Sequence, residues 1–177
     1  QTILAPTGMQ DSDIQKIMGQ LLSVPVDAAD IFLQSSHSES WVLEGGIIKE
    51  GRHNIEQGAG VRAVAGEKTG FAYSDRIELP VLLEAANNVK AIVRHGQEAQ
   101  VGLPKTTHWP HYYATANPLK SLDDQEKIDL LRKVDTETRK LDSRIEEVIV
   151  SMVGVHECVL VASQDGSLAA DIRPLVR

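Results

Sequence analysis

The fold is decided first by the stretch WVLEGGIIKE, residues 41–50, in which two β-rich runs flank Gly45 and Gly46. Glycine suits both positions of a two-residue hairpin loop, because both can be required to adopt a positive φ. A connection this short also forces the two strands that it joins to be antiparallel. The stretch therefore predicts a β-hairpin with strands near 40–44 and 47–50.

Further strands are predicted on both sides of this hairpin. They are short runs rich in β-branched, aromatic or alternating apolar residues, near 30–36, 58–65 and 71–74. The last two runs flank a glycine-bounded loop at 66–70, which predicts a second, longer hairpin. Together these strands indicate an antiparallel sheet.

The end of the chain is also strand-like. Residues 148–153 and 156–163 are apolar and rich in valine, and we expect them to pair as a terminal β-hairpin. Asp165 and Gly166 then form a typical turn sequence.

Helical periodicity is found in three segments. The first follows Ser12, which with Gln15 resembles a capping box. The two longer helices are expected near 79–94 and 122–145, the latter capped by Ser121 or Asp123. The predicted fold class is therefore α+β: an antiparallel sheet of hairpins with the two long helices on one face, plus a terminal β-hairpin.

Composition and charge narrow the class of protein. A length of 177 residues suits one domain, and 18 Lys and Arg against 25 Asp and Glu give a net charge of −7. An acidic chain offers no electrostatic reason to bind nucleic acid. Cys158 is the only cysteine, so an internal disulfide is impossible and an oxidising compartment is not indicated. No apolar run approaches the roughly 20 residues that span a bilayer. We expect a cytoplasmic protein with neither nucleic-acid nor membrane partners.

Two histidine motifs partly resemble metal sites. His156 and Glu157 begin like a His-Glu-x-x-His zinc helix, but position 160 is Leu160 and the surrounding sequence is strand-like, so a structural role is favoured. His108 and His111 could share a metal ion in a loop, yet no cysteine or third histidine lies nearby in the sequence. We therefore predict no metal site in this chain.

Two other motifs also have simpler explanations. Residues 58–63 match a loose dinucleotide-binding fingerprint, but they lead into a hairpin and not into a helix, so the glycines more plausibly allow a bulge or a close backbone approach. Cys158 lies in an apolar run, which favours a buried, inert thiol. The sequence thus predicts no catalytic residue.

Several stretches taken together resemble the TldD/PmbA family of zinc metallopeptidases, at 30–36, 39–44, 57–63, 66–73, 169–171 and 173–177. The resemblance covers nearly the whole chain from about residue 28. It implies that residues 1–177 are the amino-terminal domain of a TldD-like metallopeptidase, incomplete and without the catalytic half. It also implies a TldE/PmbA-like partner subunit, with which such proteins cleave peptides, microcin precursors among them, and unstructured polypeptides.

The resemblance implies a zinc site that this chain does not carry. The family's site is a His-Glu-x-x-x-His helix plus a later cysteine, in the carboxy-terminal half of the family's chain. Here Val161 stands where the second histidine would follow His156, and Cys158 lies inside the would-be motif. Zinc is therefore expected in the parent protein, and residues 1–177 alone are expected to be inactive.

The candidate contacts for a peptide or partner lie on the second predicted hairpin. An exposed strand edge can pair with an extended peptide through main-chain hydrogen bonds, and this suits a peptidase for unfolded chains. The polar and aromatic residues that we select there are Arg62, Glu67, Lys68 and Tyr73.

An alternative of a different class remains open. The chain could be a stand-alone, non-enzymatic interaction module, for example an antitoxin- or gyrase-binding factor. A reading frame that continues beyond Arg177 into a His-Glu-x-x-x-His helix would exclude this alternative.

Overall fold

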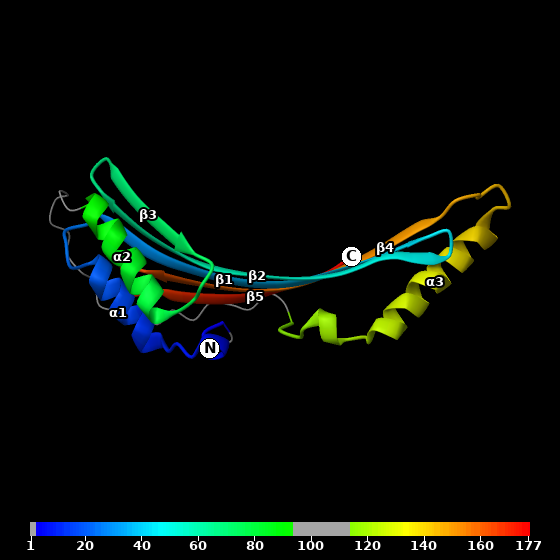
Figure 1. The fold of residues 1–177 in the computed structure, drawn as a ribbon, viewed down its shortest axis with the longest axis horizontal. Helices are drawn as coiled ribbons and strands as arrows, with labels where there is room; N and C mark the ends of the chain where they lie inside the picture. Colours follow the sequence, from blue (N-terminus) through cyan, green and yellow to red (C-terminus); the bar gives the residue numbers. More distant parts are fainter. Residues whose placement is uncertain (1–2, 94–113) are drawn as a thin grey trace. The chain divides into compact units, whose positions relative to one another are not determined.

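The computed structural model describes residues 3–93 and 114–177, and it contains five strands, three α-helices and two short 3-10 helices (Figure 1). In chain order these elements are η1 (Ala5–Thr7), α1 (Asp11–Leu21), β1 (Ala28–Glu44), β2 (Ile47–Ala65), β3 (Lys68–Ser74), α2 (Leu79–Val93), η2 (Pro118–Lys120), α3 (Asp124–Leu141), β4 (Ile149–Ser163) and β5 (Leu168–Val176).

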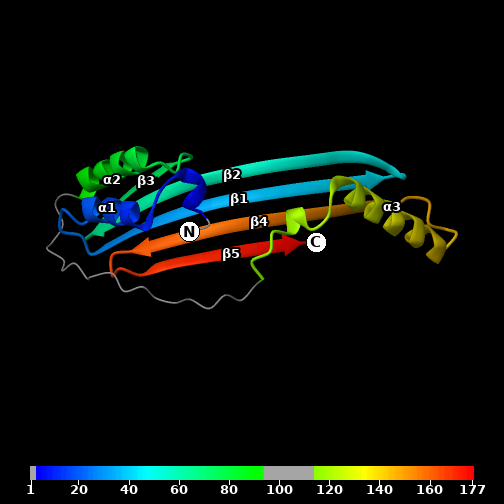
Figure 2. The ribbon, with the colours of Figure 1, turned by 90° about the horizontal axis from the view of Figure 1, so that it is seen from below.

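The strands form one sheet in the order β3-β2-β1-β4-β5 (Figure 2). β4 runs antiparallel to β1, since the amide of Gln164, just after β4, donates to the carbonyl of Ala29 at the start of β1 at 2.9 Å. β4 and β5 form the terminal hairpin. The α+β class, the antiparallel sheet and the hairpin at the end of the chain are thus confirmed.

The strands are longer than the sequence predicted. The expected strands near 30–36 and 40–44 are one strand, β1, and those near 47–50 and 58–65 are one strand, β2. Residues 148–153 and 156–163, expected to pair with each other, are likewise the single strand β4, so the terminal hairpin joins β4 to β5 instead. Strand preference depends on pairing with neighbours more than on local composition, so polar residues inside a sheet did not break these strands.

The turns follow from the glycines. Gly45 and Gly46 have φ values of 57° and 77° and close the β1–β2 hairpin as predicted. The β2–β3 connection is shorter than the expected five-residue loop, because Ala65 already pairs with Lys68 and leaves only Gly66 and Glu67 in the turn. Gly66 alone supplies the positive φ, which is enough for a type II′ turn.

β2 contains one irregularity that sets its register. Ile48 packs on a cluster formed by Trp41, Leu43 and Leu131, and a Cβ added to Gly51 would lie 3.0 Å from the Trp41 ring. Ile48 and Gly51 therefore face the same side of the sheet, although they are three positions apart. Side chains of a regular strand alternate, so one extra residue must be accommodated between them, as in a β-bulge. The shift places Arg62 beside Asp30, where a regular register counted from the Gly45-Gly46 turn would have paired it with Ala29.

The described residues divide into two compact units. Unit 1 comprises 3–35, 56–93 and 158–171, and unit 2 comprises 36–55, 114–157 and 172–177. In unit 1, α1 packs on α2 and α2 packs on β3. Its core consists of fully buried side chains from both helices and from the helix-facing positions of the strands, including Ile17, Leu21, Ile31, Leu33, Val61, Leu82 and Val89. The opposite face of the sheet in unit 1 carries no helix among the described residues (Figure 1).

Unit 2 is organised around α3. Leu131 of α3 packs on Trp41 and Leu43 of β1. Asp123 and Glu126 form the capping box that starts this helix, which confirms Asp123 as one of the two predicted caps. The helix ends at Leu141, four residues earlier than expected, because Asp142 is already extended. The box that starts α1 is also different from the predicted pair, since it joins Gln10 and Asp13 rather than Ser12 and Gln15.

Candidate functional site

One edge strand of the sheet is β3, which lies in unit 1; the other edge strand is β5. Within the described residues β3 pairs with β2 alone; the pair Ala65↔Lys68 flanks the two-residue turn, and Ala63↔Gly70 lies two pairs further along the strands. In such a hairpin the pair next to the turn exchanges both main-chain hydrogen bonds, and the bonding then alternates along the strand. The amide and carbonyl groups of Thr69, Phe71 and Tyr73 therefore point away from β2, toward the open edge.

The four residues selected from the sequence lie on this hairpin, but not on one surface. Register places Arg62 opposite Phe71, and Tyr73 two positions further along the same face, away from α2. Lys68 has the opposite parity and lies on the α2 side of the sheet, while Glu67 lies in the turn. Arg62 is already engaged, since its guanidinium contacts the Asp30 carboxylate at 2.6 and 2.8 Å.

Aromatic side chains gather on the face without helices. Phe71 and Tyr73 are 58% and 81% exposed, and their rings stack with centroids 6.4 Å apart and planes at 23°. Together with Phe32 on β1 they border a hollow of about 440 Å³. Sequence reasoning selected only Tyr73, although the alternation of Phe71 and Tyr73 on an edge strand was a visible signal for the whole group.

Glycines form the floor of this hollow. A Cβ added to Gly60 would lie 3.1 Å from the Phe71 ring, and one added to Gly58 would lie 3.2 Å from the Ser74 carbonyl oxygen. Contacts this short are tighter than ordinary van der Waals packing, so side chains here would displace the neighbouring strand or ring. The glycines thus allow a close approach, as the sequence suggested, and because they lie inside β2 they are not the phosphate-binding turn of a dinucleotide site.

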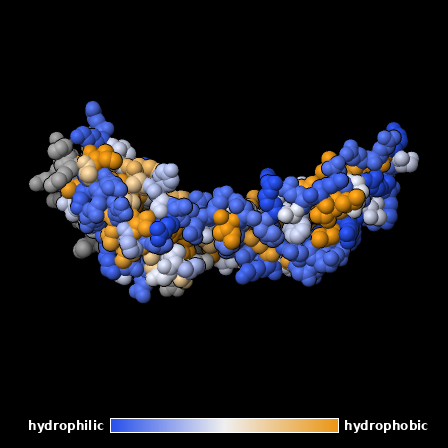
Figure 3. Space-filling model, in the orientation of Figure 1, coloured by the Kyte–Doolittle hydropathy of each residue, from blue (hydrophilic) through white to orange (hydrophobic). Residues whose placement is uncertain are grey.

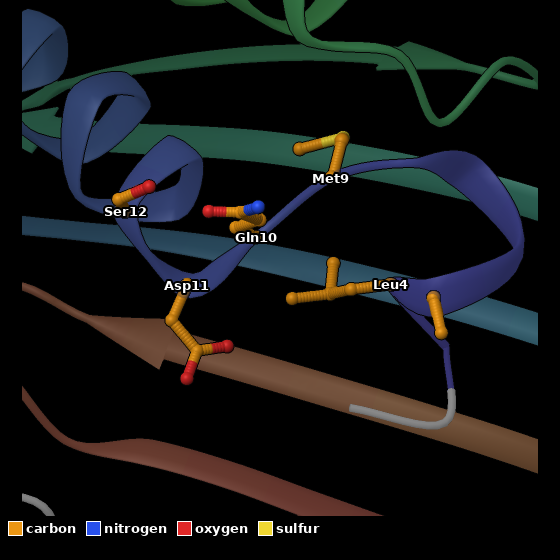
Figure 4. A pocket seen from close by; sticks show the side chains of 6 residues that line it. Leu4, Met9, Gln10, Asp11 and Ser12 are labelled. Atoms are coloured by element: carbon orange, nitrogen blue, oxygen red, sulfur yellow. The ribbon is translucent and has the colours of Figure 1, made fainter.

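A second hollow in unit 1 adjoins the start of α1 (Figure 4). Leu4 and Met9 supply its apolar part, and Gln10, Asp11 and Ser12 its polar part. The Gln10 amide donates to the Asp13 carboxylate at 3.1 Å, and the Gln10 side chain accepts from the backbone of Asp13. Gln10 therefore already serves the cap of α1.

Unit 2 contains a buried ion pair. The Lys127 ammonium of α3 lies 2.9 and 3.0 Å from the two oxygens of Glu39 on β1, and it donates to the Leu119 carbonyl at 3.1 Å. Both side chains are about 95% buried. A buried charge needs a partner, and this pair supplies one to each residue while holding α3 on the sheet. The more exposed His53 lies 3.7 Å from Glu39.

His156 lies in β4 and not in a helix. The pKa of His156 is lowered from its ordinary value of 6.5, mainly by partial burial and then by the positive charges of His37 and Lys120. The neutral imidazole is therefore favoured. Glu157, the next residue in the strand, points to the other face, so the two side chains cannot act as they would on one face of a zinc helix.

The described residues do not fit a zinc centre. Among 3–93 and 114–177, no group of three His, Cys, Asp or Glu side chains is placed to hold a metal ion. Cys158 is buried in β4. His108 and His111, the other candidate pair, lie outside the described residues. No catalytic step through a metal can therefore be built from the described side chains.

Within the described part of the chain, no helix is both long enough and apolar enough to cross a membrane.

Comparison with known proteins places this fold in a family. Residues 29–93 match PmbA/TldA metallopeptidase domain 1, and residues 117–177 match the PmbA/TldA metallopeptidase central domain. The chain belongs to the PmbA/TldD metallopeptidase family. Among its relatives, the Metalloprotease TldD homolog of Haemophilus influenzae is 45% identical over 99% of this chain. The homolog of the same name from Buchnera aphidicola subsp. Schizaphis graminum is 38% identical, also over 99% of this chain.

The chain spans 37% and 36% of the length of these two relatives. Solved structures share the fold at lower identity. TldE from Thermococcus kodakarensis matches 93% of this chain and 37% of its own, with a TM-score of 0.65 and 15% identity. A candidate modulator of DNA gyrase from Thermotoga maritima gives the same coverage of both chains, with a TM-score of 0.68 and 14% identity.

Proposed function

We propose that this chain is the amino-terminal, peptide-holding part of a TldD-like zinc metallopeptidase. Together with a TldE/PmbA-like subunit, the whole protein would cleave peptides and unstructured polypeptides, using zinc ligands that lie outside residues 1–177. Family membership supports the metallopeptidase class, and the name of the H. influenzae relative is consistent with it.

The observation that carries the peptide-holding role is the open edge of β3. Thr69, Phe71 and Tyr73 direct their main-chain groups outward, where a peptide in extended conformation can add as a further strand. Binding through the main chain reads no sequence, which suits a protease for unstructured polypeptide. Of the residues selected earlier, Tyr73 and Arg62 lie beside this edge on one face, and Lys68 and Glu67 would contact the peptide near the turn.

The edge can be tested by replacing one outward amide. Thr69→Pro removes an N–H that β2 does not use, so the ladder within the sheet is kept while strand addition loses a donor. Thr69→Val is the matched control, because it keeps the amide. We expect an unstructured polypeptide to slow hydrogen exchange of the β3 amides in wild type and in Thr69→Val, and to do so far less in Thr69→Pro. Equal protection in all three proteins would refute strand addition at β3.

An apolar stripe on α3 supports a docking role for unit 2. Leu130, Val134 and Leu141 are exposed and fall on one side of the helix by their spacing, and apolar side chains are visible over α3 in Figure 3. A partner subunit would remove this surface from water. Val134→Glu should therefore weaken capture of a TldE/PmbA-like subunit, whereas unchanged capture would exclude this stripe as the contact.

A further inference from the structure

The hollow beside β3 displays aromatic surface to water. Phe71 and Tyr73 stack on the edge strand β3, and Phe32, at 39% exposure, stands on β1, beyond the intervening strand β2. The faces of aromatic rings carry partial negative charge, so a cation placed over them is attracted. Two stacked, exposed rings thus offer a flat surface that a cationic group can cover.

The charges around the hollow have the matching sign. Arg62 is paired with Asp30 at 2.6 Å, and Arg76 is paired with Glu78 through hydrogen bonds of 3.0 and 2.6 Å. The pKa of Arg76 is raised first by its hydrogen bond to Glu78, and Asp75 contributes least to that shift.

Asp75 lines the hollow itself, so its carboxylate adds a negative charge to the lining. Of the described residues that line the hollow, none is Lys, Arg or His, and the remaining polar groups are neutral.

We propose that this hollow binds the cationic side chain of an arginine or lysine in an extended peptide that lies along β3. The inference rests on the proposed function, to which it adds a preference for basic residues. The guanidinium or ammonium group would lie on the Phe71 and Tyr73 rings, with Asp75 at its edge. The glycine floor of β2 leaves room for the aliphatic stem.

Other side chains fit this surface less well. A leucine would contact the rings but gain nothing from Asp75, and a glutamate would be repelled by it. Arginine should bind best, because its planar guanidinium stacks on aromatic rings and is more weakly hydrated than an ammonium group. A flat apolar hollow without the carboxylate would have favoured leucine instead.

The hollow can be tested alone with single-residue ligands, which are too short to add to β3 as a strand. The chain is titrated with the N-acetyl methylamides of arginine, leucine and glutamate, and the ring signals of Phe71 and Tyr73 are followed by NMR. We expect the arginine derivative to bind about threefold to tenfold more tightly than the leucine derivative, from a cation–π contact together with an exposed charge pair. The glutamate derivative should bind most weakly, and added salt should reduce the preference.

Variants of Tyr73 and Asp75 test whether these two side chains cause the preference for arginine over leucine. Tyr73→Leu and Asp75→Asn should each lower the arginine-to-leucine ratio, by about twofold to fivefold. Glu84→Gln removes one negative charge from the exposed surface of α2 and should leave the ratio unchanged. Equal binding of arginine and leucine, tighter binding of leucine, or a ratio that neither Tyr73→Leu nor Asp75→Asn alters would overturn the proposal.

The outcome of this titration is independent of the outcome of the Thr69→Pro experiment on the β3 edge. If arginine is preferred but Thr69→Pro leaves amide protection unchanged, the cation site stands and strand addition fails. If Thr69→Pro abolishes protection while arginine and leucine bind alike, strand addition stands and the cation site fails.

Discussion

Glu39 and Lys127 form a buried ion pair that unit 2 keeps away from water. The Lys127 ammonium has two carboxylate oxygens and a carbonyl oxygen within 3.1 Å, so its three donors are satisfied. Helical periodicity predicted α3 but not the buried partner of Lys127. The pairing could not be read from the sequence, because the two residues are 88 positions apart.

Removing one member of this pair should destabilise unit 2. Lys127→Met leaves the Glu39 carboxylate buried without its cation, which costs about 3–5 kcal/mol in comparable cases. Glu39→Leu combined with Lys127→Met should recover most of that loss, because no buried charge remains. Urea unfolding followed by Trp41 fluorescence in a Trp109→Phe background is the measurement, since Trp41 packs on Leu131 of the same helix.

The control for this pair is Lys140→Met in the same helix. The Lys140 side chain is 64% exposed, so this change should stay within about 0.5 kcal/mol. A Lys127→Met protein as stable as Lys140→Met would show that the buried pair contributes nothing.

His156 should make folding depend on pH. Its pKa is lowered from 6.5 mainly by burial, so the unfolded chain takes up the proton before the folded chain does. The stability that the neutral imidazole contributes is complete above pH 6.5 and is lost as the pH falls through the lower, folded pKa. NMR titration should place the His156 midpoint below 6.5, and Lys120→Met should move it upward by removing a nearby positive charge. A midpoint at or above 6.5 would contradict this interpretation.

At the scale of elements, the sequence predicted types better than lengths. The Gly45-Gly46 hairpin, the antiparallel sheet and the helices followed from local chemistry, namely glycine in the turn and apolar spacing. The continuity of β1 through its polar centre did not, because pairing on both sides holds residues such as Ser38 in the strand. Nor did the irregularity in β2, since accommodating one extra residue leaves no signature in composition.

For the candidate site too, the sequence predicted local features but not how they are arranged in space. Tyr73 and the edge of its hairpin were found, but the turn at Gly66 proved shorter than expected, which moved Lys68 into β3 and onto the other face from Tyr73. Phe32 joined the site through the order of the strands, which the sequence does not reveal.

The packing of β3 on α2 depends on Gly70. A Cβ there would lie 2.7 Å from the Val89 carbonyl oxygen, an atom of the helix backbone that cannot turn aside. Gly70→Ala should therefore destabilise unit 1 by about 1–3 kcal/mol. Gly19, inside α1, has nothing within 4 Å of a Cβ, and Gly19→Ala should stabilise by about 0.5–1 kcal/mol through helix propensity. Thermal unfolding followed by circular dichroism compares the two. Equal effects of the same sign would contradict this account of the packing.

At the scale of the whole molecule, the chain has the fold and the family of a metallopeptidase but offers no zinc centre among its described residues. A metallopeptidase needs its metal to activate water and to polarise the scissile carbonyl. In the proposed function, the edge of β3 and the hollow beside it bind peptide, which needs no metal. The proposed function therefore assigns peptide binding to residues 1–177 and cleavage to the remainder of a longer, TldD-like protein.

The central claim is tested most directly by incubating residues 1–177 with zinc and a fluorogenic, unstructured peptide, and recording binding and cleavage together. We expect the peptide to bind, with protection of the β3 amides, and to remain uncleaved with or without a chelator. Turnover by this chain alone that a chelator abolishes and zinc restores would contradict the assignment of catalysis to the rest of the parent protein.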